Sequence, residues 1–529
     1  MVSGKLFLRL EEFRMRWMIL LLSLVGAILL STSTVFATDR HVPGQYPTIQ
    51  AAINAAVDGD TVIVAQDTYY ENINFGGKSI TVTSTDPNDP NVIAGTVIDA
   101  NGSGTVVTFP DVESANCVLA GFTITDGNAS DRGGGILCWD GSITIDNCII
   151  TGNSASKGGG IYSDYAELTV AGCTFSGNVV DCLGISFCGG GGIFNQYGNL
   201  IVTDCTFTEN VAVMGNGGGI YSMEGELTLT DCTFTGNSAT FEGGGVATDY
   251  NSVIVTNCTF SGNSAQYGGG MNNAHWGATA TNCIFTGNSA QRGAGVCTFY
   301  LYGGGQTLRL SNCTFSGNTA NDYGGAVCNQ AVCNLILTNC IAWGNIATEG
   351  PQVAIALEWW DGTVSISYSC VQGGQWDIYT GVGGTLNWLT GNIDSEPRFA
   401  DEGSGDYHLK STAGRWDANT NAWVTDDVTS PCIDAGNPSC PLGDEPNDSS
   451  NIRINMGAYG GTAEASKSPA NWASLADLTN DHKVNFNDLA AFAAYWLDGG
   501  YCIPGDLDRN EVVNLLDLNL FANEWLWEQ

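Results

Sequence analysis

The sequence predicts an all-β fold, a right-handed parallel β-helix, followed by a small helical module at the C-terminus. Three observations lead to this prediction. A repeat of about 25 to 32 residues runs through the chain, each copy contains short runs with two-residue alternation, and the pattern changes after residue 390. A repeat array also explains how a chain of 529 residues avoids the need for one compact core.

The repeat is centred on Asn/Asp-Cys-x-Phe-x-Gly-Asn, and a glycine triplet follows each copy. Self-similarity at this period is typical of a solenoid. The cysteines are Cys148, Cys173, Cys205, Cys232, Cys258, Cys283, Cys313 and Cys340, and the asparagines are Asn153, Asn178, Asn210, Asn237, Asn263, Asn288, Asn318 and Asn345. The triplets are residues 133–135, 158–160, 190–192, 217–219, 243–245 and 268–270, with degenerate forms at 293–295 and 324–326.

Each copy holds three short runs that predict three strands per coil. In one copy these runs are residues 220–221, 227–230 and 232–234. Alternation turns Leu227 and Leu229 inward and the threonines between them toward water. Stacked coils place like residues in ladders about 4.8 Å apart. We expect the asparagines to bond between coils at sharp corners, the glycines to turn the chain, and the cysteines to fill the core.

Charge and cysteine content limit the classes of partner and compartment. The formal net charge of −37 argues against a nucleic acid partner and leaves divalent cations and neutral or basic partners open. Nineteen cysteines in an exported chain favour some disulfides. Short spacing predicts three bridges, Cys182–Cys188, Cys328–Cys333 and Cys432–Cys440, and the odd total leaves at least one cysteine outside such pairs.

The N-terminus predicts export. Arg14 and Arg16 precede an apolar run, and Val35-Phe36-Ala37 is a small-x-small cleavage site, so residues 1–37 are predicted to be a secretory signal peptide. Beyond this segment no apolar run reaches the ~20 residues of a membrane-spanning helix. We therefore expect an exported protein that is extracellular, periplasmic or held at the cell surface without a transmembrane span.

The pattern divides the mature chain into a β-helix at 38–390, a closing region at 391–466 and a C-terminal module at 467–529. Apolar residues at helical spacing over 48–56 predict an N-terminal cap of the kind that a solenoid needs over its open end. This opening resembles pectin-lyase-like β-helix proteins, and the repeat resembles chlamydial polymorphic outer-membrane proteins. Strings at 394–399, 405–409, 430–436 and 456–460 resemble the closing region of choice-of-anchor Q proteins, which implies an attachment device downstream.

Two loops near the C-terminus place oxygen ligands at the spacing of a calcium loop. A main-chain carbonyl serves at position seven, and side-chain oxygens serve at positions one, three, five, nine and twelve. Each loop leads into an amphipathic helix, around residues 489–496 and 518–525. The predicted calcium ligands are Asp477, Thr479, Asp481, Lys483, Asn485 and Asp488 in the first loop, and Asp506, Asp508, Asn510, Val512, Asn514 and Asp517 in the second.

The duplicated loop and helix resemble type I dockerins, which carry aspartate at position twelve. The resemblance implies two calcium ions and a cohesin-like or other surface partner. The sequence departs from the family at two places. His482 and Glu511 stand where glycine is usual, and Thr479 replaces a better ligand in the first loop. These departures put the calcium affinity of the first site in doubt. Residues 486–487 and 515–516 differ from the Ser-Thr pair with which cellulosomal dockerins recognise cohesin.

The resemblance to pectin-lyase-like proteins raises the alternative of a polysaccharide lyase. β-Elimination needs a Lys or Arg base and usually calcium held by acids. Arg132 and Lys157 stand in register before their glycine triplets, and with Asp131 they are the best catalytic candidates. The Gly-His-Gly motif of polygalacturonases and the Trp-x-Asp-His and Arg-x-Pro-x-x-Arg motifs of pectate lyases do not occur in the chain.

The competing hypothesis is a surface or adhesive protein without catalytic activity, and we favour it. A long rod can present ladders of side chains to glycans or neighbouring cells. Tyrosine rings suit sugar stacking, because one face of the residue is apolar and its tip is polar. The candidates for this role are Tyr162, Tyr221, Tyr250 and Tyr267.

Overall fold

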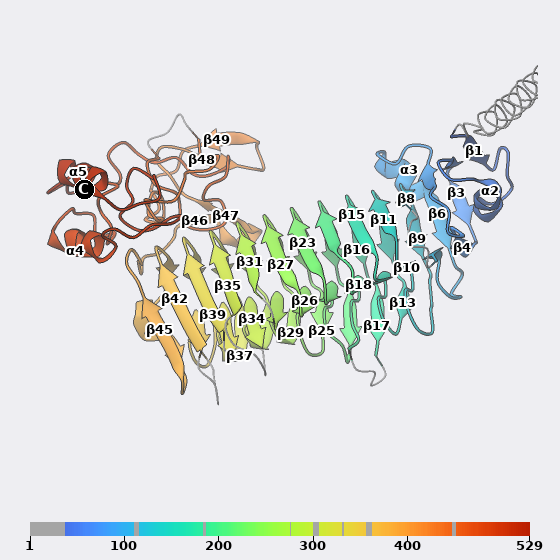
Figure 1. The fold of residues 1–529 in the computed structure, drawn as a ribbon, viewed down its shortest axis with the longest axis horizontal. Coiled ribbons are helices and arrows are strands. Elements are labelled where there is room, and N and C mark those ends of the chain that lie inside the picture. Colours follow the sequence, from blue (N-terminus) through green and yellow to red (C-terminus); the bar gives the residue numbers. More distant parts are fainter. Residues whose placement is uncertain are drawn as a thin grey trace, which may run out of the picture.

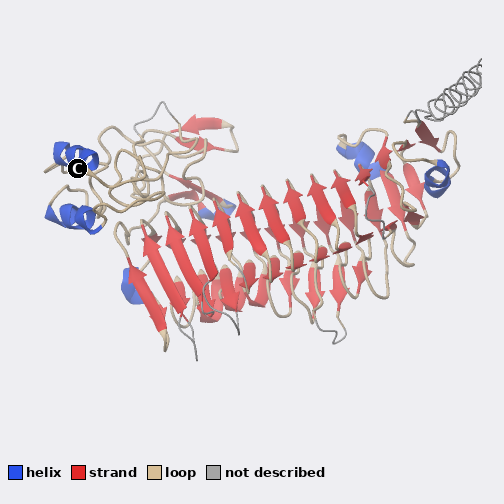
Figure 2. Cartoon of the chain, in the orientation of Figure 1, coloured by secondary structure: helices blue, strands red, loops and turns tan. Residues whose placement is uncertain are grey.

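The protein is a long parallel β-helix with its C-terminal part folded against one end of the rod (Figure 1). This computed structural model describes residues 37–110, 116–182, 187–275, 277–299, 306–330, 333–355, 362–446 and 451–529. The predicted signal peptide lies outside these residues except for its last position. Strands dominate the described chain, and the few helices lie at its two ends (Figure 2). None of the helices in these ranges is both long and apolar enough to cross a bilayer.

The strands of successive coils pair in parallel and form four sheets, here called A, B, C and D. The chain runs from C to A, to B, to D and back to C, and like residues face one another across coils, as Leu227 and Val253 do. Three strands per coil were predicted, and these form sheets A, B and C. Sheet D was not predicted, because its strands are as short as two residues and carry little hydrophobic signal.

Sheet A has 14 strands: β1 Asp39–Val42, β2 Thr61–Val64, β5 Thr81–Ser84, β8 Asn116–Ala120, β11 Ser142–Asp146, β15 Glu167–Ala171, β19 Leu200–Thr203, β23 Glu226–Thr230, β27 Ser252–Thr256, β31 Ala278–Thr281, β35 Gln306–Ser311, β39 Cys333–Thr338, β42 Gly362–Ser367 and β45 Gly384–Trp388. Sheet B has 12 strands: β3 Asp67–Tyr69, β6 Thr96–Asp99, β9 Thr123–Thr125, β12 Ile149–Thr151, β16 Thr174–Ser176, β20 Thr206–Thr208, β24 Thr233–Thr235, β28 Thr259–Ser261, β32 Ile284–Thr286, β36 Thr314–Ser316, β40 Ile341–Trp343 and β43 Cys370–Val371. Sheet C has 12 strands: β4 Ile73–Asn74, β7 Val107–Phe109, β10 Ile136–Trp139, β14 Ile161–Asp164, β18 Ile193–Gln196, β22 Ile220–Met223, β26 Val246–Asp249, β30 Met271–Ala274, β34 Val296–Phe299, β38 Val327–Gln330, β41 Val353–Ile355 and β44 Tyr379–Thr380. Sheet D has 7 strands: β13 Ser154–Ala155, β17 Val179–Asp181, β21 Val211–Val213, β25 Ser238–Ala239, β29 Ser264–Tyr267, β33 Ser289–Arg292 and β37 Thr319–Tyr323.

Stacked side chains fill the interior of the rod, as predicted. Phe207 and Phe234 are fully buried with their rings 4.7 Å apart and nearly parallel, and the same stacking continues along sheet B. The repeat cysteines form a neighbouring buried ladder, in which the backbone amide of Cys232 approaches the sulfur of Cys258. Apolar burial along this continuous core is the main force that holds successive coils together.

The repeat asparagines bond between coils at the corner that joins sheets B and D. Asn237 is fully buried, and its side-chain amide donates to the Asn263 side-chain oxygen at 3.0 Å and to the Phe207 carbonyl at 2.9 Å. Its own side-chain oxygen accepts from the backbone and side-chain amides of Asn210. Each asparagine therefore satisfies backbone groups that the corner leaves without a strand partner.

The glycine triplets form the turn that joins sheet D to sheet C. Gly217 has a φ of +64°, a conformation that other residues seldom adopt. A Cβ on Gly218 would lie 2.5 Å from the carbonyl oxygens of Gly244 and Ser238. Side chains are excluded here because the backbones of adjacent coils come too close, so the glycines are structural, as predicted.

Short helices and turns complete the N-terminal end. The predicted cap is α2, Ile49–Ala55, and Thr48 caps its first turn. Its apolar face is buried against the first coil, while the buried carboxylate of Asp60 pairs with Arg40 at 2.6 Å. A second helix, α3 (Pro90–Gly95), begins at the capping residue Asp89.

Residues 391–446 and 451–466 fold back along the side of the rod (Figure 1). Asn282 and Asn312, at the corner between sheets A and B, both donate to the Gly460 carbonyl at 2.7 Å. Phe399 and Tyr407 pack with Ile341 in a second buried cluster beside the rod. The elements from the last coil through this region are η1 Gly374–Asp377, β46 Phe399–Asp401, η2 Glu402–Ser404, β47 Asp406–Leu409, β48 Arg415–Asp417 and β49 Ala422–Val424.

One of the three predicted disulfides forms as predicted. Cys182 and Cys188 are bridged. Cys440 pairs with Cys502 of the C-terminal module instead of Cys432, which is buried with a free thiol. Cys328 and Cys333 also keep free thiols. Proximity in sequence misled these two predictions, since Cys328 lies in sheet C and Cys333 begins the next strand of sheet A.

The C-terminal module contains two helices, α4 (Phe486–Ala494) and α5 (Leu515–Asn523), as the amphipathic pattern predicted. Phe492 and Phe521 meet between the helices with ring centroids 5.5 Å apart. Asn485 and Asn514 each begin a helix with a capping box that includes the aspartate three residues later. The two halves of the module are thus built alike.

Candidate functional sites: two acidic loops and a cationic turn

The first acidic loop gathers three of the predicted ligands. Asp477, Asp481 and Asp488 each offer an oxygen within 4.8 Å of the others. Asp477 accepts from the backbone amides of Asp481 and His482, which wraps the loop around its carboxylate. Asp488 accepts from the Thr479 amide and hydroxyl and from the Asn485 amide. Asp477 and Asp488 are buried, and Asp481 is exposed.

The second loop repeats this arrangement. Asp506, Asp508 and Asp517 form its group, and two of them are buried. Asp506 accepts from the amides of Asn510 and Glu511, the same loop positions that bond to Asp477 in the first loop. Asp517 accepts from the amides of Asp508 and Asn514. Two sequence segments with different side chains therefore produce one backbone geometry.

The loops tolerate the residues that depart from the dockerin pattern. His482 and Glu511, at the usual glycine position, have φ values of +64° and +70°. The backbone thus keeps the left-handed turn that glycine normally supplies, at some cost in strain. The predicted ligands Asn485 and Asn514 use their side-chain oxygens to cap the helices, and Lys483 directs its ammonium to Glu528 at 2.6 Å.

The chemistry of these loops fits a hard divalent cation. Carboxylate oxygens are the ligands that calcium prefers. Burial, against the opposing charge of Arg453 and with the charge of Asp488, raises the pKa of Asp477 to about 6. Partial loss of hydration and the charge of Asp517 likewise raise the pKa of Asp508, although its side chain is exposed. Three carboxylates held this close repel one another, and a bound cation would remove both the repulsion and the cost of burying their charge.

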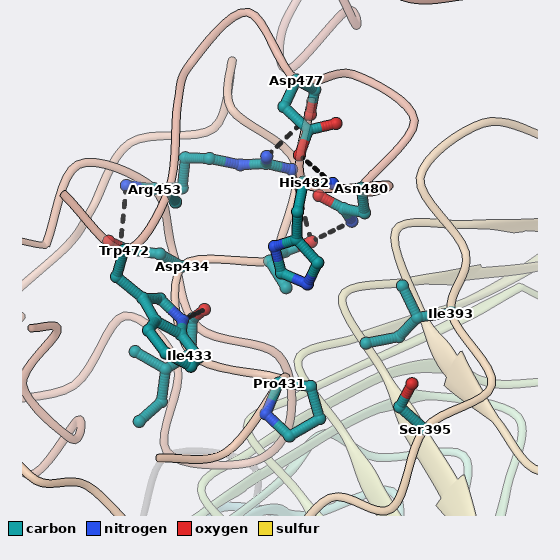
Figure 3. A pocket seen from close by; sticks show the side chains of 12 residues that line it. Ile393, Ser395, Pro431, Ile433, Asp434, Arg453, Trp472, Asp477, Asn480 and His482 are labelled. Atoms are coloured by element: carbon teal, nitrogen blue, oxygen red, sulfur yellow. Dashed lines mark hydrogen bonds between the residues drawn. The ribbon is translucent and has the colours of Figure 1, made fainter. Parts of the chain in front are cut away.

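Arg453 fastens the first loop to the region beside the rod (Figure 3). Its guanidinium is fully buried and donates to the carbonyls of Gly436 and Asp477, both at 2.8 Å. The side chain of Asn480 donates to the carbonyls of Gly391 and Ala435. A cavity of about 120 Å³ remains at this junction, lined in part by Asp434, Trp472 and His482.

The second loop is fastened in a similar way. Arg509 donates to the carbonyls of Pro438 and Ile452, at 3.0 and 2.8 Å. The disulfide between Cys440 and Cys502 joins the same two parts of the chain. The module therefore packs as a fixed part of the described molecule.

The cationic turn contains the residues that were predicted as catalytic candidates. Arg132 and Lys157 are paired across adjacent coils, as their spacing predicted. Arg132 lies 3.5 Å from Asp131 and 3.6 Å from Asp164, between the rings of Trp139 and Tyr162 at 5.2 and 5.0 Å. Trp139 and Asp164 were missed, although both occupy the last position of a sheet C strand and align in the repeat.

The surroundings of Lys157 change its acidity. Its ammonium lies over the Phe194 ring at 5.5 Å. Burial lowers the pKa of Lys157, and the positive charge of Arg132 lowers it further. These shifts favour the neutral amine, which is the form that a general base requires. The structure brings the predicted trio together and leaves its catalytic role a prediction.

Two of the four predicted sugar-stacking tyrosines are in the wrong place for that role. Tyr162 and Tyr221 are each 1% exposed. They alternate outward from sheet C, but they pack with Phe194 and Met223 in a buried cluster. Tyr250 is exposed, and Tyr267 is partly buried beside Cys297.

Comparisons with known proteins agree with this architecture. A family model described as right handed beta helix region matches residues 112–371, so the fold is a right-handed parallel β-helix. A second model, described as disaggregatase related, matches residues 330–436, which span the last coils and much of the adjoining region. The crystal structure of pectate lyase Pel9A is similar with a TM-score of 0.40 and 13% identity, over 80% of this chain and 96% of that one. No curated protein matches the chain significantly.

Proposed function

We propose that this chain is an exported surface or extracellular protein whose rod binds glycans and whose C-terminal module holds calcium and attaches to a partner. The observation that supports attachment is the duplicated acidic loop. Both loops set one buried aspartate at each end and a third, exposed aspartate nearby. A dockerin-like module that depends on calcium would use these three carboxylates as its calcium ligands.

Calcium would supply positive charge to each group of three carboxylates. In the first loop Asp477, Asp481 and Asp488 would bind it, with help from Thr479 and the carbonyl of Lys483. In the second loop Asp506, Asp508 and Asp517 would bind it, with Asn510 and the carbonyl of Val512. The same aspartates accept backbone hydrogen bonds, so metal binding would also order the loops.

The exposed first turns of α4 and α5 provide the contact surface for a partner. Phe486, Leu515 and Leu516 are 74%, 70% and 62% exposed. Apolar side chains this exposed stabilise a protein only when something covers them. A partner with two apolar pockets fits this surface, whereas a cohesin that expects hydroxyl groups at these positions does not.

Calorimetry of the calcium-stripped mature protein tests the calcium proposal. We expect two ions per chain, and one in Asp517→Ala, which loses a bridging carboxylate of the second loop. Asp498→Ala serves as a matched control, because Asp498 lies in the module outside both loops. Binding of two ions by both Asp517→Ala and Asp488→Ala would rule out the assignment.

A second candidate function is polysaccharide cleavage by β-elimination at the cationic turn. The lowered pKa of Lys157 favours it, since a neutral amine beside Arg132 can remove a proton while the guanidinium holds a uronate. Among the described residues, however, the acidic groups fit for calcium lie in the C-terminal module. Formation of unsaturated uronate ends that Lys157→Ala abolishes would establish this activity.

A further inference from the structure

In six successive coils, one residue adopts a left-handed backbone at the corner between sheets C and A. Strand register aligns these residues from one coil to the next. Their φ values lie between +51° and +79°. We call them the C–A corner ladder: Asp140, Tyr165, Tyr197, Glu224, Tyr250 and His275.

Backbone geometry alone does not explain these residue types. The corner between sheets A and B makes the same left-handed demand, with φ values between +46° and +80°. Asparagine and aspartate meet that demand, because their short polar side chains tolerate the conformation. A tyrosine in the same conformation is strained. Seven coils place Asn147, Asp204, Asp231, Asn257, Asn282, Asn312 and Asn339 at the A–B corner, two others place Gly121 and Gly172 there, and the tyrosine at this corner, Tyr368, is fully buried, unlike those at the C–A corner.

The rings of the C–A corner ladder are exposed and layered along the rod. Tyr165, Tyr197 and Tyr250 are 61%, 39% and 41% exposed. The Tyr165 and Tyr197 rings stack with centroids 4.8 Å apart, and the Tyr250 and His275 rings stack at 3.9 Å. Two ring pairs thus occupy four coils, and the coil between the pairs carries Glu224.

The gap between the two ring pairs has the size of a sugar ring. Tyr197 and Tyr250 are two coils apart, which is about 9.6 Å along the rod. A sugar ring that stacks on both tyrosines needs a distance of about 4.5 Å between its face and each tyrosine ring. Glu224 is exposed in the intervening coil, where its carboxylate can accept hydrogen bonds from two neighbouring hydroxyls.

The charge around the gap selects against an anionic ligand. Asp140 and Glu224 belong to the ladder itself, and Asp249 lies beside it in contact with the His275 ring. The charge of Glu224 contributes to the raised pKa of Asp249, so the two carboxyls are neighbours. Arg132 reaches only the first coils of the ladder, where it pairs with Asp164 beside Tyr165, whereas Glu224 and Asp249 lie at the gap itself.

We infer that the C–A corner ladder binds a neutral polysaccharide, with one hexose ring between Tyr197 and Tyr250 against Glu224 and the chain running across the rod. This inference rests on the proposed glycan-binding function of the β-helix. Tyr165 supports the site from the other side, because its ring stacks on the Tyr197 ring. The stacked rings supply apolar contact, and the carboxylate fixes the orientation of the hydroxyl groups.

Calorimetry with hexasaccharides of β-1,4-glucose, β-1,3-glucose and β-1,4-mannose, carried out in EDTA, tests this site. We expect at least one to bind, with affinity at least tenfold weaker in Tyr197→Asn and Tyr250→Asn and weakened in Glu224→Gln. The asparagine variants keep a residue suited to the left-handed corner, so they should fold. Tyr70→Ala is the control, because Tyr70 is 70% exposed but lies near the N-terminal cap.

Other results would overturn the inference in distinguishable ways. Binding of a neutral hexasaccharide that is unchanged in the Tyr197→Asn, Tyr250→Asn double variant would place the glycan elsewhere and leave the proposed glycan binding intact. Binding of polygalacturonate or chitosan alone would contradict the neutral ligand. If no glycan binds, both the site and the glycan-binding function fail, while calcium-dependent attachment stands or falls by its own titration.

Discussion

The interior ladders and the C–A corner ladder repeat with the same period but differ in what their side chains do. Asn237 and Phe234 are buried and contact the equivalent residues of the coils before and after. Tyr197 is exposed, and its conformation opposes its residue type. A repeated position whose side chain is buried therefore serves the fold. A repeated position whose exposed side chain is unsuited to its backbone conformation indicates a binding surface instead.

The largest effect is expected for Phe234→Ala in the interior. The ring stacks between Phe207 and Phe260, and its loss would leave a cavity in a continuous core. We expect the free energy of unfolding to fall by about 3–5 kcal/mol. Urea unfolding followed by circular dichroism measures this change. If Phe234→Ala loses no more free energy of unfolding than Tyr197→Asn, the two ladders do not differ in their contribution to stability.

Asn237→Ala should have the next largest effect. It removes the acceptor of the Asn210 amides and the donor to the Phe207 carbonyl. Leaving such buried groups unpaired should lower the free energy of unfolding by about 2–4 kcal/mol. Thr228→Ala, on the outward side of a neighbouring strand, is the matched control and should change stability little. Equal losses in the two variants would show that the asparagine ladder is not structural.

The outer face of sheet C should make stability depend on pH. Burial raises the pKa of Glu242 to about 7 from a usual value near 4.5. The folded state therefore binds this proton more tightly, and its stabilisation is complete below pH 4.5 and is lost as pH rises through about 7. Because Glu242 is partly exposed, we expect a loss on the order of 1–2 kcal/mol between pH 4.5 and 7.5. Unfolding of Glu242→Gln at both pH values should show a smaller loss, and an equal loss would refute the assignment.

The smallest effect is expected for Tyr197→Asn. Asparagine is better suited to the left-handed backbone, and the lost ring is partly exposed, so stability should change by less than about 0.5 kcal/mol. Thermal unfolding measures this directly. A large destabilisation would mean that the ring packs for stability, and it would weaken the case that the ladder exists for binding.

Local periodicity was enough to predict the interior of the rod. The asparagine, glycine, cysteine and phenylalanine ladders follow from a repeat in which each position has the same neighbours one coil away. Burial on the outer face of sheet C did not follow, because side chains of the turn from sheet D, Arg132 and Lys157, lie over the rings of Tyr162 and Phe194. Alternation within one strand carries no information about a turn that lies over it.

Long-range contacts were the other limit. The ligand spacing of Asp477 and Asp488 is local, and the structure brings both into one acidic group. The guanidinium of Arg453 and the bridge from Cys440 to Cys502 connect segments far apart in sequence. Nothing in the neighbourhood of these residues indicates their partners.

The packing of the C-terminal module against the rod has a mechanical consequence. Arg453, Arg509 and the Cys440–Cys502 bridge tie the module to the closing region, and Asn312 ties the closing region to the rod, so the described parts are held together at several points. Twelve strands at about 4.8 Å make a stiff arm of roughly 60 Å. If a partner binds the module, the rod will keep a fixed direction relative to that partner. A force on the far end of the rod will then act on the binding interface as a torque.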